Sequence, residues 1–344
     1  MIAKNDAEAL FKEDVAQEIF KHVAENSVVL SLGRRLANMT AGQRRLPIMS
    51  ALPMAYWVDG VPGDPADKSP SGQNTLGFKQ TTTAEWKNKY IHAEEIAVIV
   101  PIPVSVAEDS SYDIFGEIKP YIGEAFGAVI DAAVLHGTNA PSNFPTDIVA
   151  AAKAAGNSLE LADIGDLYDD IMGYDDSTST PGLISHVELD GYMPTGFVAG
   201  VSMRGRLRGL RDSSSGLPIF RPAVEGMAPG TAPYTIDGVP TYFPMNGGFD
   251  ESEALMIAGD WSKLVYAFRT DLTYKILDQA VIQDPDTGDI IYNLAQQDMV
   301  ALRCYMRWGW QVPNPVNRAN EVEATRYPFA VLEPGTGSGS SSPS

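Results

Sequence analysis

The clearest pattern of apolar and polar positions lies between residues 300 and 312, where every second side chain is apolar. Successive side chains of a strand point to opposite faces, so this alternation predicts a strand with one buried face. Its apolar positions are Val300, Leu302, Cys304, Met306, Trp308, Trp310 and Val312. Shorter patterns predict strands over 96–104, 197–201 and 264–282, and a hairpin over 234–243 that turns at an Asp-Gly pair.

A different period predicts a long helix over residues 110–136. Its apolar positions recur at three- and four-residue steps, which places them on one face. They include Ile114, Ile118, Ile122, Phe126, Val129 and Val134. Acidic and hydroxyl side chains at 108–111 are suited to cap its first turn, and Gly137 is suited to end it. Pro120 should kink the helix or divide it in two. The apolar face of the strand at 300–312 should pack against it.

Between these elements and the N-terminus the pattern predicts a projecting hairpin. One strand lies at Met54–Val58 and the other at Phe78–Ala93, with a tip rich in Gly, Pro and Asp between them. In the second strand Trp86 and Tyr90 share one face, and Glu85, Lys87 and Lys89 share the other. An isolated two-stranded hairpin is marginally stable in water, so this arm should lie on another surface.

Weaker patterns suggest further elements. Residues 1–26 carry a helical pattern, and Val28–Leu32 is a brief extended run. Helices are expected at Leu159–Met172 and, with three arginines, at Met203–Leu210. The end of the chain, 331–344, is expected to be a flexible tail because of its Gly/Ser-rich composition.

Composition restricts the class of protein. The chain has 344 residues, enough for a large core or two domains, and a formal net charge of −19. That charge argues against tight binding to nucleic acid, which depends on Lys and Arg. A single cysteine, Cys304, excludes an internal disulfide and fits a reducing cytoplasm. No apolar run is long enough for a transmembrane helix.

The sequence contains no catalytic, metal or cofactor motif. The four histidines, His22, His92, His136 and His186, are not at metal-ligand spacing. Asp284 and Asp286 suit a hairpin turn better than a calcium loop. Four acidic pairs could in principle serve a carboxylate-dependent hydrolase, the alternative from another class: Glu94-Glu95, Glu108-Asp109, Asp169-Asp170 and Asp175-Asp176. Solvated turns explain them as well.

The order of these elements resembles a known family. The segment PIPVSVAEDSSYDIFGEIKPYIGEAFGAVIDAAVLHGTNAP is similar to the spine-helix region of tailed-bacteriophage major capsid proteins with the Hong Kong 97-like fold. The segments SKLVYAFRTDLTYKI and NLAQQDMVALRCYMRWGWQVPNP resemble the closing strands of that fold. The resemblance covers about residues 28–315, and it rests on the order of elements rather than on one invariant motif.

The resemblance implies an α+β capsid fold with named parts. These would be an N-terminal arm (1–53), an extended hairpin loop (54–93), a peripheral domain with the spine helix (94–147 and 260–330), an axial domain (148–259) and the tail.

It also implies a structural protein of the virion with no enzymatic activity. Its copies would form pentamers and hexamers of an icosahedral head, assembled in the bacterial cytoplasm around double-stranded DNA that is not bound tightly. Portal and decoration proteins are implied partners. A start at Met1 leaves no room for a cleaved scaffolding domain, so a separate scaffolding protein is expected. The nearest alternative is an encapsulin-type compartment of the same fold.

Candidate intersubunit contacts are Trp86 and Tyr90 on the arm and the cluster Arg204, Arg206 and Arg208. Their alternatives are core packing and a solvated face. Some related shells crosslink an arm lysine to an asparagine of a neighbour. Lys68 or Lys79 with Asn314 or Asn317 are weaker candidates here, because nothing local marks them as an activated pair.

Overall fold

Two β-sheets organise the protein. The computed structural model describes residues 21, 23, 25–55, 82–104, 114–162, 166–210, 234–284 and 287–335. The four-stranded sheet has the order β1 (Arg34–Arg35), β12 (Val265–Leu277), β15 (Met299–Gln311) and β4 (Glu94–Pro103). The six-stranded sheet has the order β5 (Ser158–Glu160), β16 (Phe329–Glu333), β11 (Met256–Gly259), β8 (Gly196–Ala199), β10 (Val239–Tyr242) and β9 (Tyr234–Ile236).

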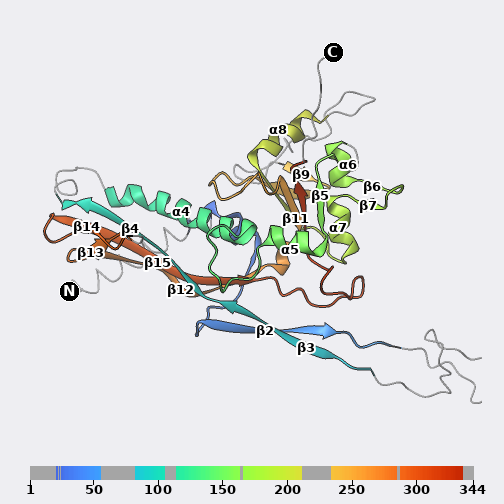
Figure 1. The fold of residues 1–344 in the computed structure, drawn as a ribbon, viewed down its shortest axis with the longest axis horizontal. Helices are drawn as coiled ribbons and strands as arrows, with labels where there is room; N and C mark the ends of the chain where they lie inside the picture. The colour runs from blue at the N-terminus through green and yellow to red at the C-terminus, as the bar shows by residue number, and fades with distance from the viewer. Residues whose placement is uncertain are drawn as a thin grey trace, which may run out of the picture.

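The long helix α4 (Ile114–His136) runs along the four-stranded sheet (Figure 1). Its buried Phe126 and Ile130 share one core with Cys304, Trp308 and other apolar side chains of β15. The expected packing of the strand against this helix is therefore confirmed. Pro120 does not divide the helix. It lies near the start of the described helix, where it removes only one bond to the preceding turn. Residues 110–113, the expected start, lie outside the described residues.

The segment Val28–Leu32 is a short helix, α2, and the prediction of an extended run was wrong. The free N–H groups of its first turn are capped by two side chains, one from the preceding residue and one from α4. Ser27 Oγ accepts a hydrogen bond from the Leu30 N–H, and the buried Asp131 carboxylate accepts the N–H groups of Val28 and Val29. A cap contributed by a residue about 100 positions away overrides the local preference of β-branched residues.

Helices α5 (Ile148–Ala155), α6 (Leu167–Met172), α7 (Leu183–Leu189) and α8 (Val201–Gly209) accompany the six-stranded sheet (Figure 1). The buried strand at 197–201 and the basic helix at 203–210 were predicted within two residues. The expected helix at 159–172 was wrong in its first part, because 158–160 forms β5 and the helix begins only after the cap at Asp166.

The expected tail from residue 331 was also wrong at its start. Residues 329–333 form β16, which pairs with β11 on one side and β5 on the other. Phe329, Val331 and Leu332 are fully buried. The apolar run there outweighs the Gly/Ser-rich composition of the residues that follow, of which 336–344 lie outside the described residues.

The hairpin arm consists of β2 (Gln43–Ala51) and β3 (Glu85–His92), which pair antiparallel and project from the body (Figure 1). The second strand was predicted, but the first begins eleven residues before the expected Met54. The strand β2 was not predicted because Arg44 and Arg45 interrupt its alternation of apolar positions. Met54 and Ala55 are not in a strand, and residues 56–81 lie outside the described residues.

Three smaller features complete the fold. β13 (Val281–Gln283) and β14 (Ile290–Asn293) form a hairpin at one end of the molecule (Figure 1). β6 (Tyr174–Asp175) pairs with β7 (Thr180–Pro181), and a 3-10 turn spans Trp261–Lys263. The predicted Asp-Gly turn joins β9 to β10, with positive φ at both Asp237 and Gly238. Among the described residues no helix is long and apolar enough to cross a bilayer.

Candidate assembly interface

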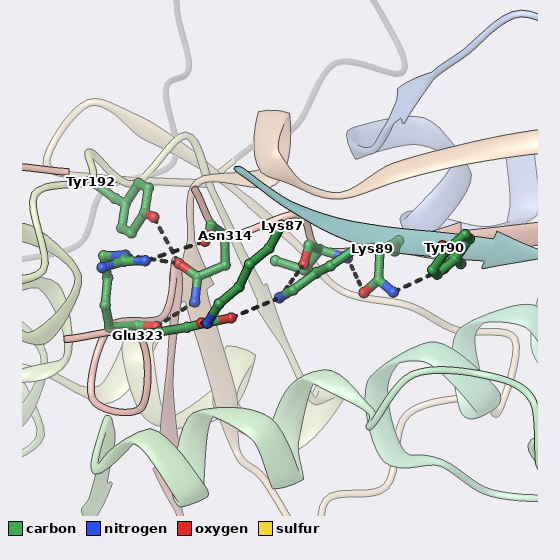
Figure 2. Close-up of polar contacts among 9 residues, drawn as sticks. Lys87, Lys89, Tyr90, Tyr192, Asn314 and Glu323 are labelled. Atoms are coloured by element: carbon green, nitrogen blue, oxygen red, sulfur yellow. Dashed lines mark hydrogen bonds and ion pairs between the residues drawn. The ribbon is translucent and has the colours of Figure 1, made fainter. Parts of the chain in front are cut away.

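The two faces of strand β3 differ sharply. Trp86 and Tyr90 lie on one face, with 65% and 39% of their surface exposed. Lys87 and Lys89 lie on the other face and both reach Glu323 (Figure 2). The predicted alternation of this strand is therefore confirmed. One face holds the arm to the body, and the other presents aromatic surface to the outside.

The ion pairs at Glu323 fix the base of the arm. Lys87 Nζ lies 2.8 Å from Glu323 Oε2, and Lys89 Nζ lies 3.9 Å from Oε1. The hydrogen bond from Lys87 lowers the pKa of Glu323, and burial lowers the pKa of Lys89. The two shifts have different causes: the lysines favour the charged form of Glu323, whereas for Lys89 the loss of solvent outweighs the attraction of Glu323 for the ammonium group.

The strand is also held through its backbone. Gln311 Nε2 donates to the Tyr90 carbonyl at 3.0 Å, and Ala93 N–H donates to the Gly42 carbonyl at 2.9 Å. Where β3 crosses β15, Gly309 lies directly against the His92 carbonyl group. A Cβ at Gly309 would lie 2.7 Å from the His92 carbonyl carbon, closer than side chains approach backbone. The crossing therefore depends on glycine.

Glu323 belongs to a segment, 312–327, that is itself anchored by a buried arginine. Arg326 is 2% exposed and donates from Nε to Asn314 Oδ1 at 3.1 Å and from Nη1 to the Asn320 carbonyl at 2.7 Å. Tyr192 Oη donates to Asn314 Oδ1 at 2.9 Å, and burial raises the pKa of this tyrosine (Figure 2). The segment that carries Glu323 is thereby a fixed support.

The predicted arginine cluster lies elsewhere. Arg204, Arg206 and Arg208 belong to α8, which accompanies the six-stranded sheet, far from the arm in Figure 1. Arg206 and Arg208 are exposed, and Arg208 Nε donates to the Arg204 carbonyl. The structure therefore does not bring the two sets of candidate contacts together.

The crosslink candidates are placed only in part. Lys68 and Lys79 lie outside the described residues. Asn314 is 5% exposed, its Nδ2 donates to the Arg326 carbonyl, and its Oδ1 accepts from Tyr192 and Arg326. Asn317 Nδ2 donates to the Asp190 carbonyl at 2.7 Å. In this structure both asparagines serve to fix the 312–327 segment.

Sequence reasoning missed Glu323 and Arg326. Glu323 lies 236 positions from Lys87 in the chain. No local pattern links a glutamate in an irregular segment to a lysine on a distant strand. Among the described residues no group of three or more His, Cys, Asp or Glu side chains is placed to hold a metal ion.

Comparison with known proteins shows to which family this architecture belongs. A model of the phage capsid family matches residues 8–316. The major capsid protein of Staphylococcus phage 80alpha is 26% identical over 290 residues, covering 84% of this chain and 77% of that protein. A solved chain from Microbacterium phage Oxtober96 is 34% identical with a TM-score of 0.70, covering 90% of this chain and 91% of that one. One from Mycobacterium phage Adephagia is 28% identical with a TM-score of 0.71, covering 91% of each.

These matches favour a phage head over a bacterial compartment, and a structural role over the hydrolase. The family model matches residues 8–316, which is most of the chain. The protein therefore belongs to the phage capsid family and is a structural protein of a tailed-phage head.

Proposed function

We propose that copies of this protein join into pentamers and hexamers through the hairpin arm, and that these close into an icosahedral shell around double-stranded DNA. The observation that carries the proposal is the exposed aromatic face of β3. Trp86 and Tyr90 point away from the body while the opposite face is held by Glu323. Large exposed aromatics on a firmly held arm are typical of surfaces that another protein covers.

The division into subdomains follows the two sheets. The arm comprises β2 and β3 with their connection, residues 43–93. The peripheral domain comprises α4 and the four-stranded sheet, over 34–35, 94–147 and 260–328. The axial domain comprises the six-stranded sheet and its helices, over 148–259 together with β16. Compared with the expectation from sequence, the arm starts earlier and the last strand moves to the axial domain, because β2 pairs with β3 and β16 pairs with β11.

The arginines of α8 are a second candidate contact. Arg206 and Arg208 are exposed on a helix of the axial domain, where their charge is available to a carboxylate of a neighbouring copy. A portal, decoration proteins and a separate scaffolding protein are further partners that membership of the family implies. The net charge of −19 supports a shell that encloses DNA without adsorbing it.

The test is the size and shape of the assembled protein. The recombinant chain is analysed by size-exclusion chromatography with light scattering, with and without the scaffolding protein, and then by electron microscopy. Rings of five and six copies, or closed particles, are the expected result. A monomer or dimer that persists at high concentration in both conditions would contradict the proposal.

A further inference from the structure

An arginine patch lies where the arm leaves the body. It consists of Arg34, Arg35, Arg44, Arg45 and Arg269, from β1, β2 and β12. Residues 26–58 contain the first four and no Asp or Glu. Arg269 of β12 lies next to the loop that precedes β2. A Cβ placed on Gly42 in that loop would be 3.3 Å from Arg269 Nη1. A surface pocket of about 340 Å³ opens between Ala37 and Arg45 within this patch.

Most of the positive charge of the patch is not neutralised within the described residues. Arg35 Nη2 lies 3.4 Å from Asp271 Oδ1, and Arg44 Nη1 donates to the Ala37 carbonyl. Arg34, Arg45 and Arg269 are exposed and have no acidic partner in the part of the chain that is described. Five arginines, for which the described residues supply one acidic partner, Asp271, form a strongly basic surface on a protein of net charge −19. Arginine is well suited to bind carboxylates in pairs of hydrogen bonds.

The opposite charge gathers at the other end of the four-stranded sheet. Residues 276–302, which contain the β13–β14 hairpin, include five aspartates and no Lys, Arg or His. Among them Asp278, Asp289 and Asp298 are exposed and have no basic partner in the described structure. We refer to the described residues 276–284 and 287–298 as the acidic tip.

The acidic tip also exposes apolar surface. Ile290 is 61% exposed, Ile276 52% and Val281 50%. Exposed apolar side chains of this size beside exposed aspartates form the pattern of an interface centre with a polar rim. They indicate that the tip is covered when the protein is assembled.

The two surfaces cannot meet within one molecule. Arg34 pairs with Val265 at the start of β12, and the tip follows Leu277 at its end. Twelve residue steps along a strand span about 40 Å, and the eight steps from Arg269 span about 25 Å. Figure 1 shows β13 and β14 at the left end of the molecule and the start of β2 near its centre.

We propose that the arginine patch of one copy binds the acidic tip of a neighbouring copy in the shell. This inference rests on the proposed assembly and names a contact within it. Because the two surfaces differ and lie at opposite ends of one sheet, the contact between copies is head-to-tail. Such a contact repeats from copy to copy until the ring or shell closes. The aspartates pair with the free guanidinium groups, while the exposed isoleucines of the tip are removed from water.

Charge reversal tests the pairing. The variant R34E/R45E leaves Arg35 and Arg44 in place, because these two side chains make contacts within the patch. The variant D278R/D289R reverses the charge at two exposed positions of the acidic tip. Placing like charges opposite each other disfavours association strongly, so each double variant should form shells in a yield lower by about tenfold or more. The four-fold variant carrying both changes should recover assembly. Thermal unfolding verifies that every variant is folded.

A matched combination separates pairing from net charge. R34E/R45E combined with D176K/E188K, two exposed acidic positions of the six-stranded-sheet unit, has the same net charge as the four-fold variant and should not recover assembly. Unchanged assembly of the first two variants, or equal recovery with either combination, would overturn the contact. Failure of the unmodified chain to form shells would instead overturn the proposed function.

A disulfide trap gives an independent readout. R45C/D289C places two thiols much farther apart within a chain than the roughly 7 Å between Cα atoms that a disulfide tolerates. Any disulfide between them therefore joins two copies. Burial raises the pKa of the native Cys304 to about 11, so it does not compete. Oxidised shells should give a ladder of dimers and larger species on a non-reducing gel, and shells that give only monomers would contradict the contact.

Discussion

His136 is a buried histidine surrounded by carboxylates at the end of α4. Its Nε2 accepts the Asp250 backbone N–H at 3.0 Å, and its Nδ1 lies 3.5 Å from Glu253 Oε2. Asp147 also faces it. Burial nevertheless lowers the pKa of His136, outweighing the attraction of these acids for the charged form. The neutral ring links α4 to the loop that precedes β11.

The lowered pKa predicts a loss of stability in mild acid. Well above pH 6.5, the ordinary pKa of histidine, the side chain is neutral in both states and its contribution to stability is complete. As the pH falls through that value the unfolded chain binds a proton before the native one does, so the free energy of unfolding decreases. H136Q should lose less stability between pH 7.5 and 5.5 than the unmodified chain, in thermal unfolding of unassembled protein. Equal losses would show that other groups are responsible.

Single residues of this kind were the hardest to predict. The sequence marks His136 only as the end of a helix, and Asp131 only as one of the charged positions outside the apolar stripe. In the structure Asp131 is fully buried and accepts hydrogen bonds from Ser27 Oγ, two backbone N–H groups and Asn246 Nδ2. Its partners come from segments more than 100 residues away in both directions, which no local pattern records.

At the scale of elements, prediction succeeded where a period is long and unbroken. The strand at 300–312 and the helix ending at His136 each have seven or more positions in register, so one exception does not hide them. Prediction failed for Val28–Leu32 and β2, which are short or mixed in character. Their conformations are decided by contacts with α4 and β3.

The crossing of β3 over β15 predicts a strong effect of one methyl group. G309A forces a Cβ against the His92 carbonyl and should destabilise the protein by about 1–3 kcal/mol. Urea unfolding measures the change. Gly205 in α8 provides the control, because a Cβ there meets no atom within 4 Å. G205A should be neutral or slightly stabilising. Equal effects of the two variants would contradict the importance of the crossing.

The ion pairs at the base of the arm predict a change in local motion. E323Q removes the charge that holds Lys87 and Lys89, but these pairs are partly exposed, so the free energy of unfolding should change by about 1 kcal/mol or less. Amide hydrogen exchange in β3 should become faster, because the arm is held less firmly. E321Q, at an exposed neighbouring position, should leave exchange in β3 unchanged. Unaltered exchange in E323Q would show that the backbone contacts alone fix the arm.

At the scale of the whole molecule, the exposed aromatics predict a separation of folding from assembly. In a single copy Trp86 is 65% exposed and Tyr90 is 39% exposed, so W86A/Y90A should lower the free energy of unfolding of the unassembled chain by only about 1 kcal/mol. Shell formation should be lost or greatly reduced, because buried aromatics dominate protein interfaces. Light scattering during assembly provides the measurement.

E85A on the opposite face of the same strand is the matched control and should assemble normally. Assembly of W86A/Y90A at the normal rate and yield would show that these side chains are not part of the interface. Reduced assembly together with a large loss of stability would instead indicate a role within the fold.

The position of β16 has a consequence for the order of events during synthesis. This strand lies between β5 and β11, yet it is translated about 70 residues after β11 and 170 after β5. Until it emerges from the ribosome, β5 has no neighbour and β11 presents an open edge, which is prone to wrong pairing. The four-stranded sheet, in contrast, has all its strands by residue 311. A nascent chain thus carries a complete four-stranded sheet beside an incomplete six-stranded one, and the second sheet can be completed only after residue 333 has emerged.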